Sequence, residues 1–371
     1  MNIGKVVLDL PPVEGNPRNS EGAFITLKDG AIMFIYSKFS GDKPNDDASA
    51  SLSAVFSYDN GNTWTDYKTV ISKNEHMAKN IMSVSLMRMN NEDIGLFYLV
   101  RKEENDTRLH LRRSSDEGQT WSEALLCIPP EGYYVVNNDR VIKLSNGRII
   151  APTSYHRNGY SSVKPGVRWD SRGEVIFFIS DDDGLTWSEG PSKNLLPFNK
   201  YSNSGLQEPG LIELENGVLW SWSRTDLSYQ YEMFSFDKGE TWTAPQPSRF
   251  TSPCSPMSVK RIPTSRNLLA VWNPIPNYNG RAEHAGKAWN GGRNPFVCAV
   301  SEDDGNTWGS YKLIEDEQDH GYCYTAIHFV GESALLPDDS VLLAYCAGGP
   351  ADGNCLAKLR IKKISLDEVA R

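Results

Sequence analysis

The sequence lacks the features that would assign it to a membrane, to nucleic acid or to a disulfide scaffold. Its longest apolar runs have the length of strands, so no transmembrane helix is expected. Lys and Arg number 38 against 47 Asp and Glu, and the formal net charge of −9 argues against nucleic acid or an anionic membrane surface as a partner. The six cysteines include no C-x-x-C pair, so neither a metal site nor a disulfide framework is expected.

The beginning of the chain also lacks the pattern of a secretory signal. Residues 1–20 show no charged segment followed by an apolar one. We therefore expect a reduced, cytoplasmic protein, or a secreted or periplasmic one if a signal has been removed. No residue pattern indicates a cofactor. With 371 residues, of which 39% are hydrophobic, the chain can form two ordinary domains or one large closed β architecture.

What the sequence does contain is a repeated eight-residue pattern, S-x-D-x-G-x-T-W. It occurs five times, at 57–64, 114–121, 180–187, 235–242 and 301–308. The pattern is typical of a turn in which the Asp accepts backbone N–H groups, the Gly adopts a positive φ and the Trp packs the turn onto a sheet. We therefore expect the Asp and Trp of each copy to serve folding rather than catalysis.

A second repeat is an apolar hairpin that lies upstream of each turn. Its six copies occupy 24–36, 86–98, 141–152, 211–222, 259–272 and 328–345. Six hairpins with five of the turns predict six four-stranded units, which is the organisation of a β-propeller. The prediction is therefore one all-β domain over 1–371, a six-bladed β-propeller. We expect 358–366 and 6–10 to complete the last blade and so to join the chain ends.

Unusual polar residues gather where the first strand of several hairpins begins. Counting nine residues back from the turn glycine gives Glu21, Asn138 and Glu208, which we expect at equivalent positions facing the propeller axis. Their polar neighbours, together with the tyrosines that open the last hairpin, are Arg18, Asp139, Arg140, Gln207, Tyr322 and Tyr324.

In a propeller, the loops after each second strand share a face with these strand starts, and long loops over a rigid scaffold often carry function. Here they supply Asp46, Asp47, His156, Arg224 and Arg293. An Arg side chain grips a carboxylate with two parallel hydrogen bonds. Several Arg side chains at one end of the axis therefore predict an anion site. The alternative is that each forms a structural ion pair with a nearby Asp or Glu.

These features resemble the sialidase (neuraminidase) superfamily, in particular a divergent branch of it. The family binds the carboxylate of its sugar with three Arg, and the positions that match are Arg18, Arg224 and Arg293. The segment QEPGLIEL matches the family's glutamate context and supplies Glu208. Divergence is evident around Arg18, where N-P-R-N-S-E-G replaces the usual (F/Y)-R-I-P, and in the NNDR segment at 137–140.

The resemblance also implies a nucleophile and an acid/base group. The family's nucleophilic tyrosine corresponds to Tyr324 in the segment YTAI, with Tyr322 as the second choice. The acid/base aspartate, eleven residues before Ser57, corresponds to Asp46, with Asp47 adjacent. A Tyr hydroxyl deprotonated by Glu208 suits a sugar whose carboxylate would repel a carboxylate nucleophile. An inverting reaction, in which a carboxylate or His156 activates water, remains open.

The predicted function is an exo-α-sialidase that hydrolyses terminal sialic acid from a glycan or oligosaccharide, without cofactor or metal. The residues expected to line the substrate site beside the Arg triad are Glu21, Asn138, Asp139, Arg140, His156, Gln207 and Tyr322. One alternative is a hydrolase for another acidic sugar. The other is a non-catalytic carbohydrate-binding propeller, which would need the Arg residues but no Tyr–Glu pair.

Overall fold

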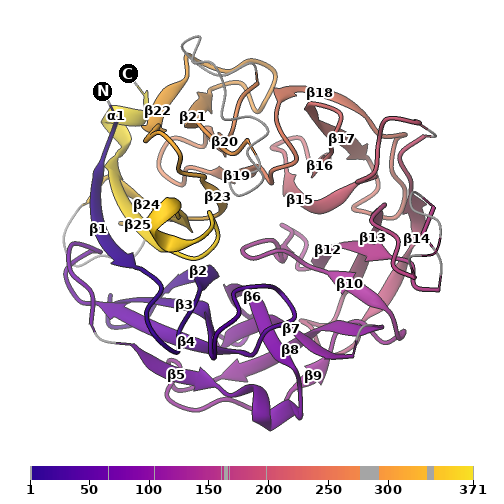
Figure 1. Ribbon diagram of the computed structural model, residues 1–371. Helices are drawn as coiled ribbons and strands as arrows, with labels where there is room; N and C mark the ends of the chain where they lie inside the picture. The colour runs from indigo at the N-terminus through magenta and orange to yellow at the C-terminus, as the bar shows by residue number, and fades with distance from the viewer. Residues whose placement is uncertain are drawn as a thin grey trace. The chain divides into compact units, whose positions relative to one another are not determined.

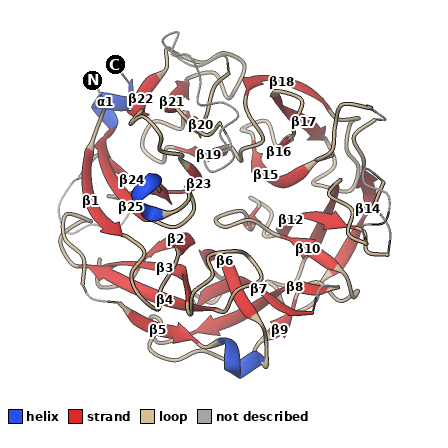
Figure 2. Ribbon diagram, viewed as in Figure 1, coloured by secondary structure: helices blue, strands red, loops and turns tan. Residues whose placement is uncertain are grey.

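The computed structural model describes residues 2–65, 67–103, 105–159, 161–162, 166, 168–197, 199–275, 292–331 and 338–370. The chain divides into two compact units. The first unit comprises Met1–Glu75 and Met257–Arg371, and the second comprises His76–Pro256. Strands dominate both (Figure 2), and the helices of the described part are η1 (Lys73–His76), η3 (Pro350–Asp352) and α1 (Leu366–Ala370). None of its helices is long and apolar enough to span a membrane.

The first unit is built of antiparallel strands that pair in chain order. One run is β2 (Asn19–Thr26), β3 (Ile32–Phe39), β4 (Ala50–Ser57) and β5 (Lys68–Ile71). A second is β19 (Ser258–Arg261), β20 (Leu268–Trp272), β21 (Phe296–Ser301) and β22 (Lys312–Glu315). The third is β23 (Cys323–Phe329), β24 (Ser340–Cys346) and β25 (Leu359–Ser365), and its outer strand is β1 (Lys5–Leu10).

The pairing of β1 with β25 joins the two ends of the chain. Figure 1 shows β1, in indigo, beside β25, in yellow, and Leu8 lies opposite Ile361 in the antiparallel register. This confirms the prediction that segments 6–10 and 358–366 lie in one sheet.

The second unit repeats the antiparallel order. Its strands are β6 (Asn80–Arg88), β7 (Ile94–Glu103), β8 (Asp106–Ser114) and β9 (Leu125–Leu126), then β10 (Tyr133–Val135), β11 (Ile142–Lys143), β12 (Ile149–His156), β13 (Glu174–Ser180) and β14 (Ser188–Asn194), then β15 (Gln207–Glu213), β16 (Leu219–Arg224), β17 (Tyr229–Ser235) and β18 (Gln246–Thr251). The short strand β10 pairs with both β8 and β12. All six predicted hairpins are antiparallel pairs, three in each unit.

Each unit has its own apolar core between neighbouring sheets. In the first unit, Phe24 and Phe34 pack against Leu342 and Ile361. In the second, Phe177 packs with its neighbours Ile150, Val175, Leu211 and Leu219. Burial of these side chains holds the sheets rigidly together, so the strand ends are fixed platforms for polar groups.

The repeated turns share one hydrogen-bond pattern. In the third copy, the Asp182 carboxylate accepts the hydroxyl of Ser180 at 2.9 Å and the N–H and hydroxyl of Thr186 at 2.8 and 2.6 Å. Gly184 has φ +85° and donates its N–H to Ser180 Oγ at 2.8 Å. The Trp187 indole donates to the Gly184 carbonyl at 3.0 Å. The hydrogen bonds from Thr186 hold the pKa of Asp182 down, at about 2. The turn predicted from the pattern is therefore present, built of local contacts.

Candidate functional site

Four of the hairpins carry an irregularity at the same place, near the start of their first strand. The register shifts between Ser20 and Ala23, Met82 and Ser85, Gln207 and Gly210, and Cys323 and Ala326. At each shift one non-glycine residue has a left-handed backbone: Glu21 (φ 53°), Ser83 (φ 60°), Glu208 (φ 46°) and Tyr324 (φ 60°). We call these four the bulge residues. Such a conformation costs roughly 1–3 kcal/mol for a residue with a Cβ, and its recurrence at the same position of four strands points to function.

Three of the bulge residues were singled out from the sequence, namely Glu21, Glu208 and Tyr324. The fourth, Ser83, was missed because the sequence count started from turn glycines. The left-handed turn residue nine positions after Ser83 is Glu92, with φ 68°. In the sheet that contains β11, the left-handed residue is Asp139, with φ 58°, and not its neighbour Asn138. Asn138 is buried, and its N–H is bonded to Asn137 Oδ1 at 2.7 Å.

In the first unit, a buried arginine, Arg18, joins two of the predicted site carboxylates. Arg18 Nη2 donates to Glu21 Oε1 at 2.7 Å, and Nη1 donates to Asp46 Oδ1 at 2.6 Å. Its Nε donates to Ser20 Oγ at 2.9 Å, and its guanidinium lies 4.5 Å from the centre of the Phe39 ring. These contacts fix the orientation of the guanidinium.

The two carboxylates differ in exposure, which gives them different chemical capacities. Glu21 is buried, whereas the side chain of Asp46 is 57% exposed. Burial alone would lower the pKa of Arg18, but attraction by Asp46 and Glu21 raises it well above its usual value. Arg18 is therefore a permanent cation, and Asp46 is the carboxylate that can meet a solute. Asp47, its neighbour, is also exposed.

Arg293 and Tyr324 form the second part of this site. The Arg293 guanidinium carbon lies 5.2 Å from the centre of the Tyr324 ring, and Nη1 contacts Cys323 Sγ at 3.0 Å. Cys323 lies opposite Cys346 across β23 and β24, and β23 packs beside β2, the strand that follows Arg18. The structure thus brings Arg18, Glu21, Asp46, Arg293 and Tyr324 to one edge of the first unit. The contact of Cys323 with Arg293 was not foreseen.

Tyr322 and Tyr324 lie in different surroundings, although they are only two residues apart. Tyr322 is 0% exposed and packs in the core with Phe296 and Tyr345. Burial is the main cause that raises the pKa of the Tyr322 hydroxyl well above its usual value. Tyr324 is 8% exposed and sits at the bulge beside Arg293. Of the two, Tyr324 is therefore the one that lies beside a predicted site arginine.

In the second unit, Glu208 is the centre of a separate polar cluster. Arg224 Nη2 lies 3.2 Å from Glu208 Oε1, and Arg224 Nε donates to Gln207 Oε1 at 3.2 Å. Gln207 Nε2 donates in turn to the Ser171 carbonyl at 2.8 Å. Gln207 therefore fixes the orientation of Arg224, which in turn holds Glu208.

Arg140 adds a second cation to this cluster. Its side chain is buried, and burial lowers its pKa to about 10, although Asp139 and Glu208 oppose the shift. The backbone N–H of Arg140 donates to Ser85 Oγ at 3.0 Å. The structure thus brings Asp139, Arg140, Gln207, Glu208 and Arg224 together within the second unit.

His156 lies in the wall of the second unit as a neutral group. Its ring stacks on Trp169 with centroids 4.9 Å apart, and Nδ1 contacts the Asp170 carbonyl at 3.0 Å. Burial lowers the pKa of His156 to about 4, so the ring is uncharged at neutral pH. These contacts suit a packing role beneath the half-exposed Trp169.

Arg18 and Arg224 form ion pairs with nearby carboxylates, as the structural alternative supposed. The partners of Arg18 are Glu21 and Asp46, and the partner of Arg224 is Glu208, which are the carboxylates predicted for the site itself. Within the described ranges, no group of three or more His, Cys, Asp or Glu is placed to hold a metal ion.

Comparisons with known proteins place the chain in a family. A family model described as a BNR repeat-like domain matches residues 52–335. The chain is 27% identical over 254 residues to the anhydrosialidase of Macrobdella decora, and the match covers 64% of this chain and 29% of that protein. It is 26% identical over 252 residues to the sialidase of Paraclostridium sordellii, covering 60% of this chain and 56% of that protein. The chain thus matches little more than half, or less, of these relatives' length.

Solved structures agree on the fold. The NanB sialidase of Streptococcus pneumoniae superimposes with a TM-score of 0.71 at 14% identity, covering 100% of this chain and 71% of that one. Because the family model covers most of the chain, it identifies the family directly. The chain therefore belongs to the BNR repeat-like domain family and is a member of the sialidase superfamily.

Proposed function

We propose that this protein is an exo-α-sialidase built on a six-bladed β-propeller, which hydrolyses terminal sialic acid from glycans or oligosaccharides. The observation that carries the proposal is the set of bulge residues. Glu208 and Tyr324, the two residues that a tyrosine-based sialidase needs for its nucleophile, both hold a left-handed backbone at the same position of their strands. Strained backbone of this kind persists where function requires it.

The proposed roles follow from the chemistry of each group. Arg18, Arg224 and Arg293 bind the sugar carboxylate and offset its charge. Tyr324 attacks the anomeric carbon after Glu208 takes the proton from its hydroxyl. Asp46, exposed beside Arg18, protonates the departing oxygen and then activates water.

The proposal is tested by proton NMR of the protein mixed with a simple α-sialoside, followed from the first minute. We expect α-sialic acid to appear first and the β anomer to follow by mutarotation. Early β anomer would keep the sialidase activity and remove Tyr324 as the nucleophile. An intramolecular anhydro sugar would favour the activity for which the Macrobdella decora relative is named.

The same experiment tests the other two functions. A sialoside that binds without turnover would indicate a carbohydrate-binding propeller. Neither binding nor turnover would indicate a different acidic sugar, and a panel of uronides would then identify it.

A further inference from the structure

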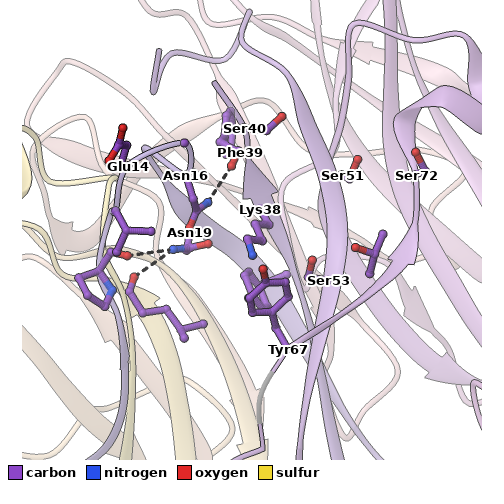
Figure 3. A pocket seen from close by; sticks show the side chains of 16 residues that line it. Glu14, Asn16, Asn19, Lys38, Phe39, Ser40, Ser51, Ser53, Tyr67 and Ser72 are labelled. Atoms are coloured by element: carbon purple, nitrogen blue, oxygen red, sulfur yellow. Dashed lines mark hydrogen bonds between the residues drawn. The ribbon is translucent and has the colours of Figure 1, made fainter. Parts of the chain in front are cut away.

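The first unit contains a cavity of about 640 Å³ that the proposed chemistry does not use. It lies between the segment that follows β1 and one face of strands β2–β5 (Figure 3). Its volume is in the range of small-ligand sites, which is roughly 300–1,000 Å³. Phe39 lines this cavity, and its ring is the one on which Arg18 rests. The cavity and the Arg18 cluster therefore share a wall, although their polar groups differ.

The sheet face in this cavity is polar across four adjacent strands. Lys38 of β3 lies opposite Asn19 of β2 and Ser51 of β4. Tyr36 lies opposite Ser53, which in turn lies opposite Thr69 of β5. All six residues line the cavity, and the opposite wall includes Leu10, Pro11 and Val13. We call the six sheet residues the polar face.

The polar face includes one buried acceptor that the described residues leave without a hydrogen-bond donor. Asn19 Nδ2 donates to the carbonyls of Leu10 and Pro11 at 3.3 Å, which fixes the amide. Figure 3 shows its oxygen on the other side, toward Lys38, and this buried oxygen has no donor among the described residues. The hydroxyls of Tyr36, Ser53 and Thr69 belong to the same cavity lining.

The charge and the open side of the cavity indicate the class of ligand. The cavity lining contains one cation, Lys38, and one carboxylate, Glu14. The Lys38 ammonium lies over the Tyr67 ring at 2.8 Å from its centre. Tyr67 is 54% exposed. Burial and the adjacent Tyr67 raise the pKa of Tyr36, so its hydroxyl remains a neutral donor. The lining thus combines neutral hydroxyls, an amide oxygen and an exposed aromatic ring without a net charge.

We propose that this cavity is a second saccharide-binding site, which takes a neutral hexose disaccharide. Sugar hydroxyls both donate and accept hydrogen bonds, and the hydroxyls of Tyr36, Ser53 and Thr69 do the same. The apolar edge of a sugar ring matches the exposed Tyr67 ring. Binding here does not depend on hydrolysis at the Arg18 cluster. The saccharide site can therefore be tested independently of the proposed sialidase activity.

The test uses lactose as the probe and saturation-transfer NMR as the measurement, with the full chain. We expect lactose to bind the wild-type protein weakly. Tyr67→Ala and Thr69→Val should each weaken binding by about fivefold, because each removes one contact worth about 1 kcal/mol. Tyr58→Ala is the matched control, since Tyr58 is an exposed tyrosine of the same unit outside the cavity.

Two results would overturn the assignment. One is that lactose gives no saturation transfer with the wild-type protein. The other is that Tyr67→Ala and Thr69→Val bind lactose as well as Tyr58→Ala does. Both Tyr67 and Thr69 are exposed at the surface, so their variants should keep the fold, and a thermal melt of each confirms this. The readout is binding, so it remains decisive even if the protein has no sialidase turnover.

Discussion

The repeated hairpin units differ between their two ends, one of which carries the S-x-D-x-G-x-T-W turn and the other the bulge residue. At the turn end, all five copies have the same side chains and the same contacts: the Ser hydroxyl lies 2.8–2.9 Å from the Asp, and the Thr hydroxyl lies 2.5–2.6 Å from it. At the bulge end, the backbone repeats but the side chains are Glu21, Ser83, Glu208 and Tyr324. A repeated side chain indicates a folding element, whereas a repeated backbone with different side chains indicates a site.

The largest expected effect on activity comes from a substitution of a bulge residue. Tyr324→Phe removes the proposed nucleophile and keeps the ring beside Arg293. We expect kcat for an α-sialoside to fall by about four orders of magnitude, while the sialoside still binds. Steady-state kinetics and equilibrium binding on the same preparation provide the check.

The matched control for that variant is Tyr322→Phe, which removes a hydroxyl from a ring packed in the core. We expect its kcat to stay within a few-fold of the wild-type value. If Tyr322→Phe is the inactive variant, the assignment of the nucleophile is wrong.

The next largest effect concerns the acid/base group. Asp46→Asn keeps the shape of the side chain and removes its proton chemistry, so we expect kcat to fall by about 10²–10⁴-fold. Asp47→Asn, next to it in the same exposed loop, should retain most of the activity. Parallel pH–rate profiles make the comparison. Equal losses in both variants would show that the loop matters for structure and would leave the acid/base role without support.

A smaller effect is expected for a change in how the substrate carboxylate is bound. Arg224→Lys keeps a positive charge but loses the fork that contacts both Gln207 and Glu208. We expect KM to rise by about 10–100-fold with a smaller change in kcat, because one charge-assisted hydrogen bond is worth about 1.5–3 kcal/mol. An unchanged KM would contradict a role in substrate binding.

A substitution in one of the repeated turns should lower the stability of the fold and leave catalysis intact. Asp182→Asn removes the hydrogen-bonded carboxylate from a turn, so we expect a lower Tm at neutral pH with unchanged kcat/KM. Folding lowers the pKa of Asp182 from its usual 3.8 to about 2, so the ionised carboxylate stabilises the fold at every pH above about 3.8. This contribution is lost as the pH falls through about 2.

The difference in Tm between wild type and Asp182→Asn should therefore shrink below about pH 4. Thermal melts over this range test it, with Asp42→Asn in an exposed loop as the control. A constant difference would mean that the carboxylate is not the stabilising group.

Much of the fold could be predicted because its signals are local. The hairpins depend on apolar runs and turn residues within about a dozen positions, and each repeated turn closes its hydrogen bonds inside eight residues. The site was partly predictable for the same reason, since Glu21 and Glu208 lie at a fixed distance before a turn glycine.

The remainder depends on contacts that the sequence pattern does not encode. In a regular strand, residues two apart face the same side, so Tyr322 and Tyr324 could not be told apart. The left-handed backbone at Tyr324 breaks that alternation. Ser83 was missed because its turn uses a glutamate, Glu92, in place of glycine. The contact between Arg293 and Cys323 joins residues 30 positions apart.

The most direct test of the central claim is to identify the residue that the substrate modifies. A sialic acid with fluorine at C2 and C3 supplies a good leaving group and slows the breakdown of a glycosyl-enzyme adduct. The protein is incubated with this compound, and its peptides are then mapped by mass spectrometry. We predict one adduct, on the Tyr324 oxygen, and none on the Tyr324→Phe variant. An adduct on a carboxylate, or steady turnover of α-sialosides with no adduct at all, would contradict the assignment of the bulge residues as the catalytic groups.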